Sequence, residues 1–360
     1  MLRTLKATLV ALPLLFPLGA NAEELVVGSW NVKRLGSDPQ QSYQALAAVA
    51  SKMDLIALQE VMTTQGLDRL ELALEKATNT PWERLESHLI GSRQYKEAYA
   101  FLYRPEKVRY EDGAVVYLDR QNVFFREPYS ARFRTAGGTS FVLANIHVIY
   151  GNSTEERARE VSSLADYWDW LAEVYPREER ILVGDFNLPP SHPAWDKLKQ
   201  SAVPLITRGA TTLGQTDNKY ASLYDNIWVA RGTKLGIKRS GVVRYPQMLK
   251  ISHQVARERV SDHAPVFALI GGQGAAGQPV AQNQVFAAPE RMKQVGSALA
   301  SSNWNAKNTA GPVRGNSRTF RYHAPGCPSY ESISSKNRVE FASSAAAVKA
   351  GYSLAGNCLP

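Results

Sequence analysis

Ile181-Leu182-Val183-Gly184-Asp185-Phe186-Asn187 is the stretch that decides the fold of this chain. A short apolar run, of the kind that forms a buried strand, ends here in a carboxylate and an amide. Side chains that handle metals or protons also flank other apolar runs, at Ser29-Trp30-Asn31, Leu58-Gln59-Glu60, Asn145-Ile146-His147 and Ser261-Asp262-His263. Buried strands with such ends predict one polar rim above a sheet, suited to a divalent metal and to proton transfer at a phosphate.

Strand-like runs alternate with amphipathic helical stretches from residue 24 to residue 270. Ser153 and Glu156 form a capping box ahead of an apolar helical stripe, and Asp38-Pro39 is expected to open an earlier helix. Further strands are expected at Ala98–Tyr103 and Asn122–Arg126. The pattern predicts an α+β fold, a four-layer α/β/β/α sandwich of two packed sheets with helices outside.

The two ends of the chain differ from this domain. Arg3 and Lys6 precede an apolar run that ends at Ala20-Asn21-Ala22, which predicts a signal peptide over residues 1–22 and a secreted or periplasmic protein. No later stretch is long enough to span a bilayer, so no membrane contact is expected after cleavage. The predicted catalytic domain covers residues 23–270. Residues 271–313 are rich in Gly, Gln and Ala and predict a flexible linker before a small α+β module at residues 314–360.

The formal charge of +9 is unevenly distributed. Residues 286–360 contain nine Lys or Arg against three Glu, so most of the excess lies in the tail. A basic module beside a nearly neutral domain favours a polyanion-binding appendage, with a generally basic secreted protein as the alternative.

The polar residues at the strand ends divide by chemistry. Asn31 and Glu60 offer the hard oxygen ligands that Mg²⁺ prefers. His147 and His263 can move protons, and each needs a carboxylate that fixes its tautomer. Further side chains can complete a metal shell, orient water or support a histidine: Asp185, Asn187, Asp262, Glu97 and Asp225. His88, His192 and His253 have no such context and are expected at the surface.

Together these motifs resemble the endonuclease/exonuclease/phosphatase superfamily. The matching pieces are Asn31, Gln59-Glu60-Val61, Gly184-Asp185-Phe186-Asn187 and Ser261-Asp262-His263. Two more strings are similar to the deoxyribonuclease I branch, Tyr95-Lys96-Glu97 with the run to Pro105, and Phe125-Arg126-Glu127-Pro128-Tyr129. The resemblance covers roughly residues 25–270.

The resemblance implies a metal-dependent endonuclease that hydrolyses DNA. With the predicted signal peptide, we expect a secreted enzyme, and we expect a monomer without an obligate protein partner. It implies catalytic pairs Glu97–His147 and Asp225–His263, with Asp185 and Asn187 at the scissile phosphate. The implied metal ligands are Asn31, Glu60 and Asp262, for Mg²⁺ or Mn²⁺, and the implied DNA contacts are Tyr95 and Arg126. Ca²⁺ stays open as a further ion because Gly209–Asn218 matches the family's calcium-site sequence poorly.

The tail has its own resemblance. Tyr322 to Pro328, Arg338 to Phe341, and Ala350 to Cys358 are similar to the metal-binding module of Ada-type DNA-repair proteins. That module has four cysteines, whereas this chain offers only His323, Cys327 and Cys358, so Zn²⁺ is not expected. A disulfide between Cys327 and Cys358 is the expected staple in an oxidising compartment. The module is expected to hold DNA through Arg318, Arg321, Lys336 and Arg338, or else to serve only stability or secretion.

Other activities remain as alternatives. Phosphatases, sphingomyelinases and distending-toxin-like nucleases share the implied fold and metal core. A non-catalytic extracellular DNA-binding protein is the alternative from a different class.

Overall fold

The structure, a computed structural model, describes residues 24–271, 312–325, 327, 330 and 333–355. The predicted signal peptide and nearly all of the predicted linker lie outside these ranges, so the proposed domain boundaries stay predictions. Among the described residues, no helix combines the length and the apolar character that crossing a membrane requires.

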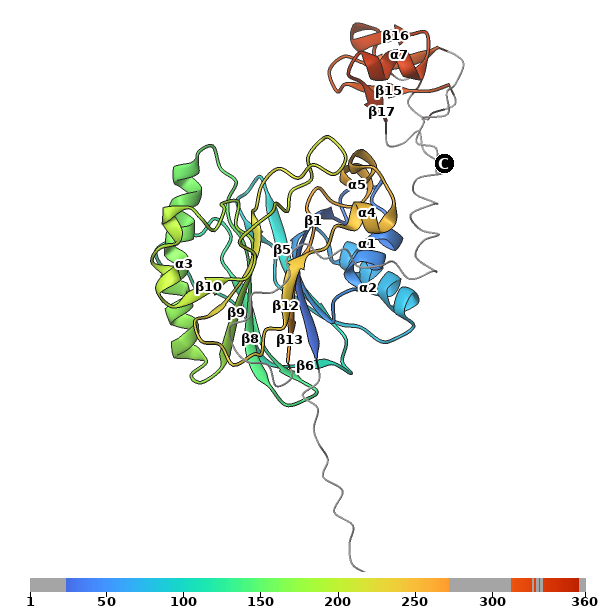
Figure 1. Cartoon of the computed structure of the whole chain (residues 1–360). Coiled ribbons are helices and arrows are strands. Elements are labelled where there is room, and N and C mark those ends of the chain that lie inside the picture. The colour runs from blue at the N-terminus through green and yellow to red at the C-terminus, as the bar shows by residue number, and fades with distance from the viewer. Residues whose placement is uncertain (1–23, 272–311, 326, 328–329, 331–332, 356–360) are drawn as a thin grey trace, which may run out of the picture.

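Two sheets pack face to face, with helices on both outer faces (Figure 1). One sheet has the order β12 (Arg239–Val242), β13 (Val266–Ile270), β1 (Leu25–Leu35), β2 (Leu55–Val61), β5 (Lys96–Tyr103) and β3 (Glu83–Glu86), with β4 (Ile90–Gly91) also paired to β5. The other has the order β10 (Ala202–Pro204), β11 (Asp225–Ala230), β9 (Glu179–Asp185), β8 (Ser140–His147), β7 (Tyr129–Thr135) and β6 (Val108–Val116).

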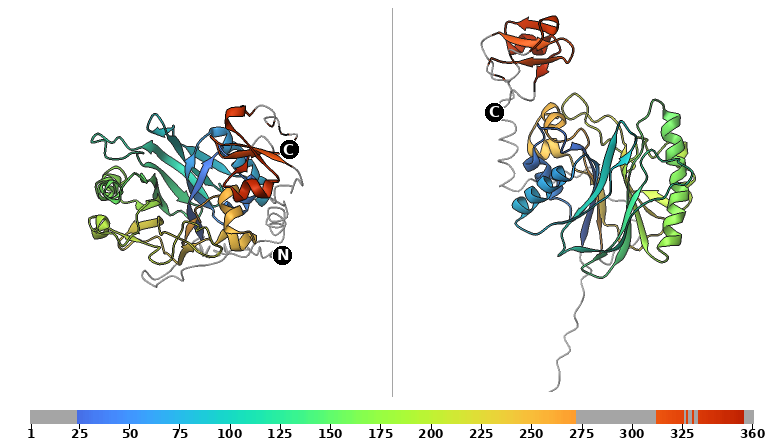
Figure 2. Two further views of the ribbon diagram at one scale, coloured as in Figure 1. Left: turned by 90° about the horizontal axis from the view of Figure 1, so that it is seen from above. Right: turned by 180° about the vertical axis from the view of Figure 1, so that it is seen from behind.

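Helix α3 (Thr154–Val174) covers the second sheet, and the remaining helices of this domain lie on the opposite side, as the view from behind also shows (Figure 2). They are α1 (Tyr43–Ala50), α2 (Thr64–Thr78), α4 (Tyr245–Leu249) and α5 (His253–Arg259), while the short turns η1 (Pro193–Trp195) and η2 (Leu198–Gln200) pack beside α3. The predicted α/β/β/α sandwich is confirmed.

The alternation of side chains along the second sheet explains why its strands are apolar throughout. On β8, Phe141 and Leu143 belong to the core between the sheets, whereas Val142 and Ala144 pack with α3 in a separate core. Because side chains alternate with a period of two, His147 shares the inter-sheet side with Phe141 and Leu143. Polar residues at the strand ends therefore meet at the edge of the inter-sheet layer.

Three local expectations were wrong. Helix α1 begins after the N-cap Ser42 rather than at Asp38, because the Asp38 carboxylate accepts the N–H of Gln40 in a turn. Residues 122–126 form a loop instead of a strand, since the Asp119 carboxylate accepts backbone N–H groups that a sheet would use. His253 is only 1% exposed, with its ring against Tyr220.

The C-terminal module has the predicted α+β character. Its sheet has the order β16 (Arg338–Phe341), β14 (Val313–Asn316), β15 (Arg321–His323) and β17 (Ser353–Leu354), accompanied by α7 (Ser344–Lys349) and the turn η3 (Ser335–Asn337). Val313, Tyr322, Ala347 and Tyr352 form its small core. Cys358 lies outside the described residues, so the disulfide with Cys327 and the zinc alternative through His323 stay predictions.

Candidate active site

Strand register places three predicted site residues in one row. Asp225 on β11 and His147 on β8 are both register partners of Asp185 on β9. Gly184 makes this possible, because a Cβ there would lie 1.8 Å from the carbonyl oxygen of Ile146 on the neighbouring strand. The row lies at the ends of β8 and β9 and at the start of the antiparallel β11.

The first sheet supplies the opposite wall. Asn31 pairs in register with Gln59, and the pairing of β2 with both neighbours then becomes irregular around Glu60, whose φ is +60°. The Asn31 amide donates to Glu60 Oε1 at 3.0 Å within its own sheet, and to Asp185 Oδ2 at 3.2 Å across the gap between the sheets. A left-handed conformation at a non-glycine residue is costly and is common at functional sites.

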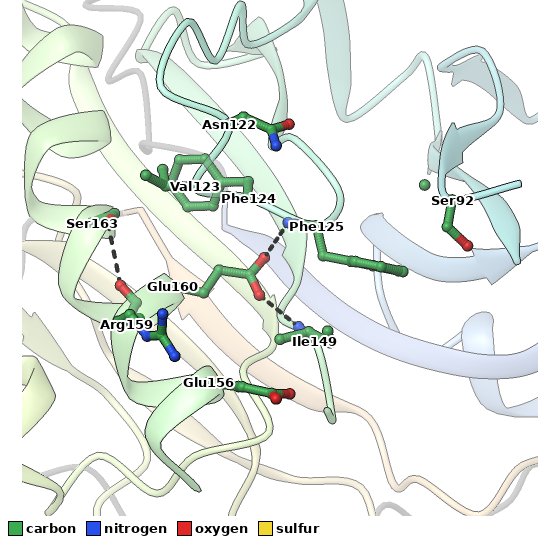
Figure 3. A pocket seen from close by; sticks show the side chains of 11 residues that line it. Ser92, Asn122, Val123, Phe124, Phe125, Ile149, Glu156, Arg159, Glu160 and Ser163 are labelled. Atoms are coloured by element: carbon green, nitrogen blue, oxygen red, sulfur yellow. Dashed lines mark hydrogen bonds between the residues drawn. The ribbon is translucent and has the colours of Figure 1, made fainter. Parts of the chain in front are cut away.

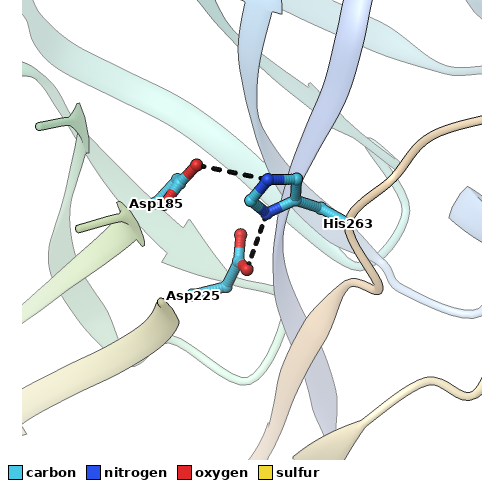
Figure 4. Close-up of side chains that lie close together, drawn as sticks. All are labelled: Asp185, Asp225 and His263. Atoms are coloured by element: carbon cyan, nitrogen blue, oxygen red, sulfur yellow. Dashed lines mark hydrogen bonds and ion pairs between the residues drawn. The ribbon is translucent and has the colours of Figure 1, made fainter. Parts of the chain in front are cut away.

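Two histidine–carboxylate pairs face each other in this layer. His147 Nδ1 lies 2.9 Å from Glu97 Oε1, and His263 Nδ1 lies 2.9 Å from Asp225 Oδ2. The Nε2 atoms of the two rings lie 3.5 and 3.6 Å from the same Asp185 oxygen, Oδ2 (Figure 4 shows the His263 side). Both pairs predicted from the family resemblance are present, and Asp185 joins them.

Burial and charge shift the pKa values of these groups. Burial lowers the pKa of His263, but Asp225 and Asp185 outweigh it and hold this pKa well above its ordinary value. Burial and Arg126 lower the pKa of His147, whereas Glu97 and Asp185 bring it above the ordinary value. Burial raises the pKa of Asp185 despite the two histidines.

Arg126 is a buried support for His147. Its guanidinium donates to the carbonyl oxygens of His147 and Val148, at 3.0 and 3.2 Å, and is only 4% exposed as a residue. The hydroxyl of Tyr99 accepts the backbone N–H of His147 at 2.9 Å. The predicted DNA contact of Arg126 stays a prediction, and the structure adds a positioning role that the sequence did not indicate.

A hydrogen-bonded bridge between the sheets was not predicted from the sequence. The Gln59 amide donates to Asn145 Oδ1 at 2.6 Å and to Ser29 Oγ at 3.0 Å, and the Asn145 amide donates to the carbonyl oxygen of Leu58. Gln59 directly precedes Glu60 on β2, and Asn145 lies two residues before His147 on β8, on the same side of that strand. Their bridge fixes the spacing of the sheets beneath the site.

The site opens into a cleft of about 580 Å³, which we call the catalytic cleft. Of the predicted residues, Asn31, Glu60, Tyr95, Arg126, His147, Asp185, Asn187, Asp262 and His263 line it. Glu97 and Asp225 lie behind the histidines and are fully buried. Sequence reasoning missed other lining residues, which include Lys33, Arg34, Tyr150, Thr212, Tyr224 and Arg257.

Two sets of side chains at or behind the cleft could hold a cation. Asp185, Asp225 and His263 place ligand atoms within 4.8 Å of one another. The Nδ1 atom of His263, however, is already engaged by Asp225 Oδ2. Asn31, Glu60 and Asp185 converge through amide and carboxylate groups, and such a donor set fits Mg²⁺ or Mn²⁺ better.

The fold and the paired histidines define a class of phosphoester-processing α/β sandwich, and comparison with known proteins places the chain within it. The model of the endonuclease/exonuclease/phosphatase family matches residues 28–263, so the chain belongs to that family, in its deoxyribonuclease I-like branch. A deoxyribonuclease of Thioalkalivibrio sp. (strain K90mix) is 43% identical over 272 residues, covering 73% of this chain and 75% of that protein.

More distant proteins are similar over the same domain. Deoxyribonuclease gamma of Rattus norvegicus is 28% identical over 263 residues, covering 66% of this chain and 82% of that protein. The solved structure of an endonuclease/exonuclease/phosphatase family protein from Bacteroides thetaiotaomicron has a TM-score of 0.51 at 18% identity, covering 70% of this chain and 99% of that one. The latter likeness shows the fold alone.

Proposed function

We propose that this protein is a metal-dependent deoxyribonuclease that hydrolyses DNA phosphodiester bonds within the chain. The observation that carries the proposal is the convergence of Glu97–His147 and Asp225–His263 on Asp185 Oδ2, inside the catalytic cleft. The similarity to the deoxyribonuclease of Thioalkalivibrio supports DNA as the substrate.

The two histidines divide the proton transfers. Each Nδ1 is engaged by a carboxylate, which leaves the Nε2 for the substrate. One ring takes the proton of the attacking water, and the other donates a proton to the leaving oxygen or hydrogen bonds to the phosphate. Asp185 keeps the two Nε2 atoms turned toward one point, so water and phosphate meet between them.

Asn31 and Glu60, with Asp185 beside them, are the residues that would hold Mg²⁺ or Mn²⁺, and Asp262 lines the same cleft. The bound ion would supply electrostatic stabilisation of the charge that develops on the phosphate oxygens.

The remaining parts of the proposal concern the protein outside the cleft. Residues 1–22 direct export to the periplasm or the medium, and the mature protein acts as a monomer. The C-terminal module holds DNA through its exposed basic residues, of which Arg318 and Lys336 lie at the surface.

The test is the nicking of supercoiled plasmid by the purified mature protein with Mg²⁺ and with EDTA. RNA, sphingomyelin and inositol phosphates serve as competing substrates that separate the activities of this fold. His147→Ala and His263→Ala should abolish nicking while circular dichroism stays unchanged, and EDTA should stop the wild-type reaction.

His88→Ala is the matched control, because His88 is an exposed histidine away from the cleft lining. Near-wild-type nicking by both cleft variants would contradict the assignment. Binding of DNA without any cleavage would favour the non-catalytic alternative.

A further inference from the structure

A second cavity, of about 670 Å³, has no role in the chemistry above (Figure 3). Ser92, the loop of residues 122–125, Ile149 and one side of α3 line it. We call it the side cavity. It combines an exposed aromatic ring, a cation and two carboxylates, a mixture that suits a polar ligand with an aromatic part.

The side cavity adjoins the catalytic cleft. Arg126 separates them, with its guanidinium carbon 5.2 Å from the ring centre of Phe125 in the cavity and 5.8 Å from that of Tyr95 in the cleft. Ile149 lines the cavity, and the next residue, Tyr150, lines the cleft. A polymer with its phosphate at His147 can therefore extend a neighbouring unit past Arg126.

Phe125 is exposed yet held in place. The neighbouring Phe124 is buried, with 4% of its surface exposed, and anchors the loop. Phe125 itself is 36% exposed. The Phe125 N–H donates to Glu160 Oε1 at 3.2 Å, and the Asp119 carboxylate accepts the N–H of Phe124 at 2.8 Å. A fixed aromatic surface loses little conformational entropy when a ligand stacks on it.

The acids of the side cavity are engaged, whereas its cation is available. Both Glu160 oxygens accept backbone N–H groups, from Phe125 and from Ile149 at 2.8 Å (Figure 3). Glu156 accepts the N–H of Asn152. The guanidinium of Arg159, on the exposed side of α3, makes no hydrogen bond or ion pair with any residue between 24 and 271.

We propose that the side cavity is a subsite for one unpaired nucleotide of the strand being cut, with its base stacked on Phe125 and a phosphate paired with Arg159. The proposal rests on the proposed nuclease function and adds a substrate class to it. Stacking on a side chain requires a base whose face is open, as in single-stranded or frayed DNA. The side cavity therefore gives single-stranded DNA an affinity advantage over duplex.

The first experiment compares cleavage of one oligonucleotide as a single strand and as a duplex by the full-length protein. Phe125→Ala should raise KM for the single strand about tenfold, the size of a lost base–aromatic stack, and leave KM for the duplex within about twofold. Phe125→Trp should keep the wild-type preference, and Arg159→Ala should raise the single-strand KM. Leu118→Ala, which removes an exposed side chain near the same loop but outside the cavity, is the control.

The second measurement does not depend on cleavage. A trinucleotide with a central 2-aminopurine is bound to His263→Ala protein, and fluorescence quenching reports stacking; adding Phe125→Ala should remove the quenching. The proposal is overturned if Phe125→Ala changes both substrates equally, changes only kcat, or leaves the quenching intact. If the wild-type protein cuts no DNA, the proposed function fails, and the quenching alone decides whether Phe125 stacks on a base.

Discussion

At the scale of single residues, the site depends on which partner each histidine nitrogen has. Asp225 engages Nδ1 of His263 from a fully buried position, and its charge raises the pKa of the ring against the effect of burial. The carboxylate thus fixes the tautomer and leaves Nε2 beside Asp185. Glu97 engages His147 Nδ1 in the same way, so the site contains two similar histidine–carboxylate pairs.

Asp225→Asn should test this arrangement with little change in shape. The amide keeps the size of the side chain but removes the charge, so we expect kcat for plasmid nicking to fall by about 10²–10⁴. The pKa of His263 should also fall, because the carboxylate that raises it is gone, and histidine NMR over a pH series would show this. Asp196→Asn, at an exposed ion pair with Lys199, is the control; an unchanged rate in Asp225→Asn would exclude the role.

At the scale of elements, the spacing of strands and the loops around α3 shape the cleft. Glu160 on α3 accepts the N–H groups of Phe125 and Ile149, so one buried carboxylate joins the helix to two loops beside the site. Gly184 brings β8 and β9 together where His147 and Asp185 meet. These contacts lie outside the catalytic pairs but set their positions.

Gly184→Ala should destabilise the protein by about 1–3 kcal/mol, a typical cost of forcing atoms into a packed interior, and reduce nicking. The new Cβ would meet the backbone oxygen of Ile146, which cannot move without displacing β8. Gly138→Ala also has positive φ but has open space around it, so it separates backbone strain from the clash. Urea unfolding measures both, and equal losses would show that the close approach is unimportant.

Glu160→Gln should change how stability depends on pH. Burial raises the pKa of Glu160 to about 7, so the folded protein binds more protons than the unfolded chain between about pH 4.5 and 7. The contribution of Glu160 to the free energy of unfolding is fully present below about pH 4.5. It is lost as the pH rises through about 7, and the loss amounts to at most about 3 kcal/mol.

Unfolding free energies at pH 5 and pH 8 measure this decline, which should be smaller in Glu160→Gln than in the wild type. Glu173→Gln, an exposed position on the same helix, should leave the decline unchanged. The same decline in wild type and Glu160→Gln would refute the linkage.

The elements also show what the sequence could predict. Apolar strands with polar ends predicted the sandwich and brought Asn31, His147 and Asp185 to one place, because two-residue alternation is visible in sequence. The convergence on one Asp185 oxygen was not predictable, since it depends on the register between distant strands. The loop around Phe125 was missed because an aspartate several residues earlier competes for its N–H groups.

At the scale of the whole molecule, the apolar layer and the chemistry occupy different parts of the sandwich. One hydrophobic core fills the layer between the two sheets and includes residues from β1 and β13. The catalytic cleft lies where the side chains of this layer become polar. Cleft substitutions such as His147→Ala therefore leave the core intact. The C-terminal module has its own small core and adds basic side chains that the cleft does not need.

The module's proposed DNA contact makes the last prediction. The Ser317 N–H donates to the carbonyl oxygen of Asn337 at 2.8 Å, which brings the β14–β15 turn beside η3 and places exposed Arg318 and Lys336 on neighbouring turns. Arg318→Glu with Lys336→Glu should weaken binding of long duplex DNA and lower the salt slope by roughly 2, because each phosphate contact contributes nearly one unit. Fluorescence anisotropy in 50–200 mM salt measures the slope, and kcat on a short oligonucleotide should stay unchanged.

Lys76→Glu with Arg109→Glu makes the same charge change in the catalytic domain, away from the cleft lining. An equal loss in both double variants would assign the effect to net charge, whereas a loss confined to the first locates DNA binding on the module.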